Sequence, residues 1–143
     1  MKKICHIIVI LLICAILLSC NLDDKNWLYH YGDSIWEADK YEAYIYVESD
    51  GLTNQEFGTI KIDGIEKEVV YLFTPGALSI CDYRGDDPKK ELYRTSDEFC
   101  YGITTFEREN KTFSFIVESS TENSIPVGTT IKFSYISDIV AVQ

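Results

Sequence analysis

Few side chains in this chain have the type and spacing that catalysis requires. A catalytic site needs a nucleophile, a base or a metal ligand with a partner in reach. Histidine occurs only as His6, inside an apolar N-terminal run, and as His30, inside a short polar stretch. Asp86 and Asp87 are adjacent in a loop bounded by glycine and proline, a context typical of solvated turns. We therefore predict no enzymatic activity, no catalytic residue, no metal site and no cofactor.

The cysteines offer a different chemistry, namely covalent modification and cross-linking. Cys5, Cys14 and Cys20 precede the polar part of the chain, whereas Cys81 and Cys100 lie in strand-like runs. The last two alternate with apolar neighbours, which are Leu78 and Ile80 in one run and Phe99, Tyr101 and Ile103 in the other. Cys81 and Cys100 could therefore face each other across adjacent strands as a disulfide, which exported proteins can keep. Two reduced thiols are the alternative.

The N-terminus has the features of a secretory signal. Lys2 and Lys3 form a short basic region, and the segment from Ile4 to Leu18 carries no charge. As a helix of about 15 residues it would be roughly 22 Å long, whereas a transmembrane helix needs about 20 residues. The pattern favours an exported protein over one with a permanent membrane helix.

The signal ends in Leu17-Leu18-Ser19-Cys20, which resembles the lipobox of bacterial lipoproteins. The resemblance implies cleavage before Cys20 and a diacylglycerol on its thiol, so that the membrane is a partner through Cys20. It predicts a signal peptide over residues 1–19, a lipidated polar tether over 20–33 and one domain over 34–143. The expected location is the outer face of the cytoplasmic membrane, or the outer membrane of a two-membrane host.

The charge of the exported part limits its partners. Lys2 and Lys3 are the only charged residues of the signal, so the remainder carries 11 basic and 23 acidic residues, a net charge of −12. Such a surface repels nucleic acid and anionic lipid headgroups. We expect a cationic partner or no charged partner at all.

From Ile35 onward the hydrophobic pattern has a period of two, which indicates β-strands. Asp63-Gly64 separates two such runs and predicts a hairpin with a type I′ turn. Short strands follow one another through tight turns, with a loop over residues 84–90 and a short strand over 91–94. The pattern predicts an all-β domain, either an antiparallel meander or a small up-and-down barrel of about eight strands. A β-sandwich is the alternative.

Three stretches carry a resemblance to a family. They are Gly32-Asp-Ser-Ile-Trp36, Gly58-Thr-Ile-Lys-Ile-Asp-Gly64 and Gly128-Thr-Thr-Ile-Lys-Phe133. In this order they resemble small uncharacterised lipoproteins of clostridia-like bacteria, with a first strand similar to that of lipocalin-type barrels. The resemblance implies a lipocalin-like fold and an extracytoplasmic place, and it implies no activity.

Two kinds of binding surface remain as hypotheses. A small apolar or sugar ligand could lie among aromatic residues at the barrel mouth, lined by Trp36, Tyr44, Tyr46, Tyr71 and Tyr101. The same residues could instead fill the core. A cationic protein, such as a lysozyme-like hydrolase that this protein would inhibit, could contact the densest acidic stretch, formed by Asp82, Asp86, Asp87, Glu91, Asp97 and Glu98.

Overall fold

A computed structural model describes Leu28 and residues 31–48, 54–83 and 95–138 of the chain. Cys20, His30, Asp86, Asp87 and Glu91 lie outside these residues, as does the strand predicted over 91–94. Within the described part, no helix is long and apolar enough to cross a membrane.

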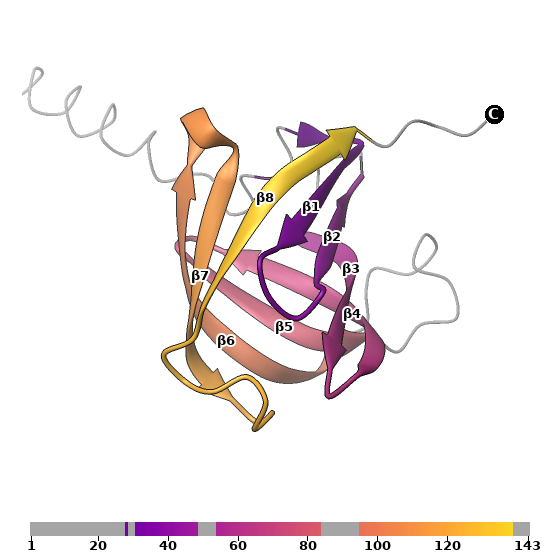
Figure 1. Cartoon of the computed structure of the whole chain (residues 1–143), viewed down its shortest axis with the longest axis vertical. Helices are drawn as coiled ribbons and strands as arrows, with labels where there is room; N and C mark the ends of the chain where they lie inside the picture. The colour runs from indigo at the N-terminus through magenta and orange to yellow at the C-terminus, as the bar shows by residue number, and fades with distance from the viewer. Residues whose placement is uncertain (1–27, 29–30, 49–53, 84–94, 139–143) are drawn as a thin grey trace, which may run out of the picture.

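The described residues form a closed antiparallel barrel of eight strands in sequential order (Figure 1). The strands are β1 (Ser34–Ala38), β2 (Tyr44–Val47), β3 (Gln55–Ile62), β4 (Ile65–Thr74), β5 (Ala77–Tyr83), β6 (Thr95–Glu107), β7 (Thr112–Ser120) and β8 (Thr130–Asp138). Each strand pairs with its neighbours in the chain, and β1 also pairs with β8. The predicted up-and-down barrel is therefore confirmed, and the sandwich is excluded.

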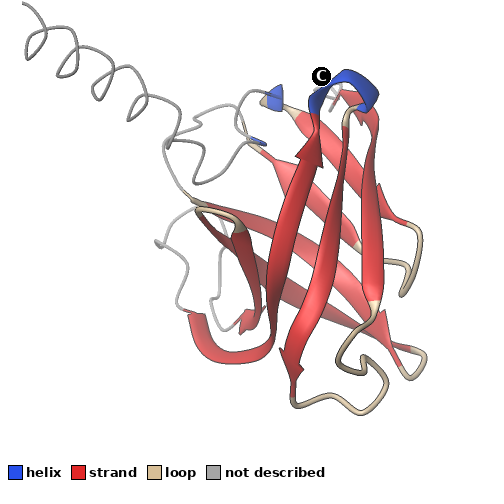
Figure 2. Cartoon of the chain, turned by 90° about the vertical axis from the view of Figure 1, so that its left-hand side faces the viewer, coloured by secondary structure: helices blue, strands red, loops and turns tan. Residues whose placement is uncertain are grey.

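The connections alternate between the two ends of the barrel. One end holds the start of β1, the end of β8 and the 3₁₀ turn η2 (Arg108–Asn110), which Figure 2 shows as a short helical turn beside the strand ends. The other end holds the β3–β4 turn and the loop of residues 121–129. In the β3–β4 turn, Asp63 and Gly64 have φ angles of 52° and 81°. Positive φ at both positions is what a type I′ turn requires, so the predicted hairpin is confirmed.

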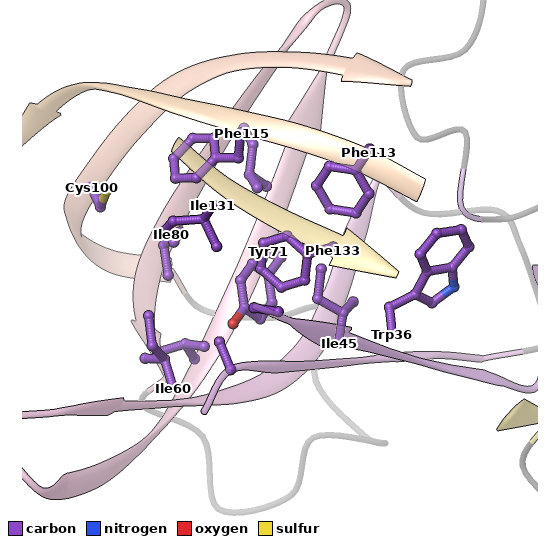
Figure 3. Close-up of a cluster of buried hydrophobic side chains, with 14 of the residues drawn as sticks. Trp36, Ile45, Ile60, Tyr71, Ile80, Cys100, Phe113, Phe115, Ile131 and Phe133 are labelled. Carbon is purple, nitrogen blue, oxygen red and sulfur yellow. The ribbon is translucent and has the colours of Figure 1, made fainter. Parts of the chain in front are cut away.

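The core is the barrel interior. Alternate residues of β7 and β8, including Phe113, Phe115, Ile131 and Phe133, are fully buried there, as their periodicity predicts. Figure 3 shows these side chains converging with Ile45, Ile60 and Ile80 from the opposite strands. Eight strands leave an interior just wide enough for side chains to fill.

Two glycines allow the barrel wall to bend. A Cβ on Gly58 would overlap the carbonyl oxygen of Tyr44 and lie 2.6 Å from Cε2 of Tyr71. A Cβ on Gly102 would overlap the carbonyl oxygen of Ile116 and lie 2.7 Å from Cε2 of Phe115. In each case an aromatic ring from the next strand covers the glycine. Glycines covered in this way allow a strand of a small barrel to bend sharply.

Candidate functional site

The five aromatic residues predicted to line one pocket lie on two sides of the barrel wall. Trp36 and Tyr71 belong to the interior cluster and are fully buried. Tyr44 and Tyr46 alternate with inward-facing residues of β2 and point outward; the Tyr44 hydroxyl donates to Glu37 at 3.1 Å, and Tyr46 stacks on Phe57. Tyr101 also points outward, because the inner face of β6 is formed by its neighbours Cys100 and Gly102. The predicted set therefore forms no single lining.

Trp36 closes the end of the barrel where β1 begins. Its indole Nε1 donates to the buried hydroxyl of Ser34 at 3.0 Å, so the ring is held without an unsatisfied polar group. Tyr31 and Tyr135 pack edge-on against the indole, with centroids 5.4 Å and 6.0 Å away. The ammonium of Lys111 lies 4.6 Å from the Tyr135 ring, within range of a cation–π interaction. We call this region the aromatic end; the fully buried Leu28 also belongs to the interior cluster.

The middle of the interior is filled by further rings. Phe113 stacks on Phe133 with centroids 4.8 Å apart and also lies 6.0 Å from Trp36. Tyr71 packs edge-on against Phe133, and its hydroxyl donates to the backbone oxygen of Thr59 at 3.0 Å. Burial raises the pKa of Tyr71, which keeps it a neutral donor at physiological pH. These aromatic rings therefore pack as part of the hydrophobic core and do not line a ligand pocket.

The opposite end, which we call the loop end, is closed by residues 121–129. Ile125 is fully buried in the interior cluster and so plugs the barrel. Polar contacts hold its loop: Lys67 pairs with Glu122 at 2.7 Å, and the Ser124 hydroxyl donates to Asp63. The hydrogen bond to Glu122 raises the pKa of Lys67.

Cys81 and Cys100 are both buried and free. The prediction that they face each other is wrong. Cys100 lies opposite Ile80 and faces the interior beside it (Figure 3), whereas Cys81, the next residue along β5, lies opposite Val70 and Glu98 on the outer side. A bulge at this point of the β5–β6 pairing brings both Phe99 and Cys100 into the core cluster, which simple alternation along β6 does not predict. Burial raises the pKa of Cys81 to about 11 and that of Cys100 to about 12, so both thiols stay protonated.

The described part of the predicted acidic surface lies where β5 ends and β6 begins, and, in addition to burial, the charges of Glu98 and Asp82 both contribute to the raised pKa of Cys81. Glu98 is exposed and lies opposite Cys81 on the outer wall. Asp82 lies opposite Val69, an interior residue, and its charge contributes to the raised pKa of Lys67 at the loop end. Asp97 is exposed near the start of β6. Asp86, Asp87 and Glu91 lie outside the described residues.

A feature that the sequence analysis missed is an exposed apolar pair on the outer wall of β6 and β7. Residues directly opposite one another in a sheet share a face. One row of such partners joins Leu72, Ser79 and Tyr101, and the next row joins Ala77, Ile103 and Ile116. Ala77 and Ser79 are buried, and the exposed Glu118 lies close to Ile116 on β7. Ile103 and Ile116 form a direct cross-strand pair in which each side chain is 44% exposed.

The outward position of this pair was missed because the alternation of Phe99, Tyr101 and Ile103 was interpreted as a core pattern. Tyr101 and Ile103 instead face outward, and the inner face of β6 carries Cys100 and Gly102. The signal available in the sequence was Gly102, since a glycine within a strand pattern often marks a bulge or a close approach. The β6–β7 register indeed shifts between Tyr101 and Gly102.

No protein-family model, no curated protein and no solved structure matches this chain. Function is therefore inferred from its own residues.

Proposed function

We propose that the protein is a lipid-anchored, non-enzymatic binding module held outside the cytoplasmic membrane, which recognises a surface component through the exterior of its barrel. The anchoring is supported by Leu17-Leu18-Ser19-Cys20 after an uncharged run of signal length. The tether is short, because only seven residues lie between Cys20 and Leu28, which is buried in the barrel.

The main support for binding through the exterior is that side chains fill the interior of the barrel. Aromatic rings occupy it from Trp36 through Phe113 to Phe133, and Ile125 plugs the loop end. A ligand of the lipocalin type would have to displace these side chains. Removing large side chains from a packed core costs several kcal/mol each, so such a ligand is disfavoured.

The second candidate function is the recognition of a cationic protein by this binding module. The charge distribution of the described residues favours such a partner. Three of the lysines form ion pairs within the protein. Lys61 pairs with Glu42, Lys67 pairs with Glu122, and the ammonium of Lys132 lies 3.8 Å from the carboxylate of Glu107. Exposed acids such as Glu98 thus remain to attract a basic partner. Charge complementarity of this kind mainly raises the association rate.

Lipidation is tested by metabolic labelling with a palmitate analogue. The wild-type chain and a Cys81→Ala control are expected to incorporate the label and to float with membranes, whereas Cys20→Ala incorporates none. Equal labelling of Cys20→Ala, or an unlabelled wild-type protein, would overturn the anchor.

The exterior mode of binding is tested with a fluorescent fatty acid and with hen lysozyme as a basic probe. We expect no saturable fatty-acid uptake, and lysozyme binding that weakens as salt rises and as Asp97 and Glu98 are changed to Asn and Gln. Changing Glu107 and Glu109, at the aromatic end, to Gln is the matched control. Saturable fatty-acid uptake that is lost in Trp36→Ala would show an interior ligand site, contrary to the proposal.

A further inference from the structure

The aromatic end already holds a cation against ring faces. The ammonium of Lys111 lies over the Tyr135 ring, 4.6 Å from its centroid, and over the Tyr31 ring at 5.7 Å. The two ring centroids are 6.2 Å apart and the ring planes are inclined by 49°, so the ammonium meets two ring faces at once. The negative faces of aromatic rings attract cations at such distances. We call Tyr31 and Tyr135 the tyrosine pair.

The tyrosine pair is held by the barrel and not by the Lys111 side chain. Both rings pack edge-on against the indole of Trp36, which is fully buried and donates to the hydroxyl of Ser34 at 3.0 Å. Tyr135 is also part of β8, and its N–H donates to the backbone oxygen of Lys111 at 3.1 Å. Removal of the ammonium would therefore leave the two rings in place. A site that is already formed costs little ordering energy when a ligand binds.

Lys111 is an exchangeable occupant of this site. Its side chain is exposed, and the ion pairs of the described residues involve other lysines, such as Lys61 and Lys67, and not Lys111. At an exposed position, the attraction of a ring face favours contact with an ammonium only about two- to fivefold. A lysine ammonium is also strongly hydrated, and it gives up part of that water to make the contact. A cation that is more weakly hydrated should therefore displace it.

A quaternary ammonium group meets this requirement. Its methyl groups spread the charge, bind water weakly and pack on ring faces, and proteins recognise such groups through aromatic side chains. The net charge of −12, with Glu107 and Glu109 exposed in the turn that leads to Lys111, attracts cations to this end. We propose that the tyrosine pair binds a choline-like quaternary ammonium group, and that Lys111 occupies the site until this group displaces it. The site adds a ligand to the proposed binding module and depends neither on lipidation nor on a protein partner.

The test is a titration of the full chain in dodecyl maltoside micelles with choline at constant ionic strength. Saturation-transfer NMR on the choline methyl protons reports binding. The variant that empties the site is Lys111→Asn, because asparagine tolerates the φ of 49° at this position. The matched control is Lys61→Gln, which removes the same charge near the loop end. Dimethylbutanol, the neutral isostere of choline with carbon in place of nitrogen, separates attraction of the charge from apolar contact.

We expect weak, saturable binding of choline to the parent chain, binding about threefold tighter or more in Lys111→Asn, and no change in Lys61→Gln. Dimethylbutanol should show no saturable binding. A Lys111→Asn chain that does not bind choline would overturn the inference. Equal tightening in both variants would also overturn it, because the overall charge would then explain the effect. Dimethylbutanol that binds as tightly as choline would do the same, since no cation would then be recognised.

Quaternary ammonium groups occur both in lipid headgroups and in solutes, and a second arm separates these sources. The anchored chain is placed in phosphatidylcholine vesicles and in vesicles of a galactosyl diacylglycerol, which is equally uncharged overall but carries no ammonium. Weaker binding of free choline in the phosphatidylcholine vesicles supports a lipid headgroup as the ligand, because the lipid then fills the site. Equal binding in both vesicles supports a solute.

The ring faces themselves are tested in the Lys111→Asn chain. Tyr135→Phe keeps the ring face and should keep choline binding, whereas Tyr135→Leu should weaken binding about fivefold or more. If circular dichroism shows that Tyr135→Leu does not fold, Tyr31→Leu replaces it, because Tyr31 precedes the first strand. Choline binding that is unchanged in the leucine variant would overturn the inference, since the site would then lie elsewhere.

Discussion

The two ends of the barrel are closed by different means. At the aromatic end, the rings of Tyr31 and Tyr135 pack against the indole of Trp36. The ammonium of Lys111 lies over the ring of Tyr135. At the loop end, a single apolar side chain, Ile125, is held in place by polar contacts such as Lys67–Glu122. Packing of this kind responds little to salt or pH, whereas an ion pair responds to both. The ends should therefore differ in what weakens them.

Trp36→Ala should have the largest effect. The indole is fully buried and contacts three other rings, so its removal leaves a large cavity. We expect a loss of about 4 kcal/mol in the free energy of unfolding, measured by urea titration. Trp36→Phe keeps a ring while freeing the Ser34 hydroxyl, and should cost clearly less. A Trp36→Ala protein of nearly wild-type stability would mean that the aromatic end does not depend on packing.

Ile125→Ala should have an intermediate effect, because its loop can partly collapse into the space that the side chain leaves. The expected loss is about 2–3 kcal/mol, and Ile125→Val should cost about 1 kcal/mol. The loop itself should also loosen, so amide exchange at Gly128, whose N–H donates to Val117 at 2.8 Å, should rise more than exchange in β8. A uniform rise in amide exchange over the whole barrel would contradict a local role for Ile125.

The sequence predicted the parts of the fold that depend on regular alternation. The pattern of β7 and β8 placed Phe113, Phe115 and Phe133 in the core, and Asp63-Gly64 identified the hairpin turn. These succeed because one local rule, a period of two or a required positive φ, decides the structure.

The sequence could not predict features that depend on a shifted register or on distant contacts. The bulge near Phe99 changes which residues of β6 face inward. Cys100 lies opposite Ile80, so Cys81, the next residue of β5, is on the other face of the wall. Ile125 lies in a stretch whose composition predicts only a loop, and its burial depends on closure of the barrel around it. Lys67 and Glu122 are 55 residues apart, so no local pattern relates them.

Lys67→Met should have the smallest effect and the clearest pH dependence. The pair is partly exposed, with about a third of each side chain accessible, so its contribution at pH 7 should stay below about 1 kcal/mol. The pKa of Lys67 is raised in the folded protein above its ordinary value of 10.5, so the stabilisation is fully present below that pH and is lost as the pH rises through the folded value.

The stability difference between wild type and Lys67→Met should therefore shrink as the pH rises above 10.5, and it should also shrink in high salt. The difference caused by Trp36→Ala should change in neither condition. If Lys67→Met instead cost the same at every pH and salt concentration, the ion pair with Glu122 would not hold the loop, and the proposed difference between the two ends would fail.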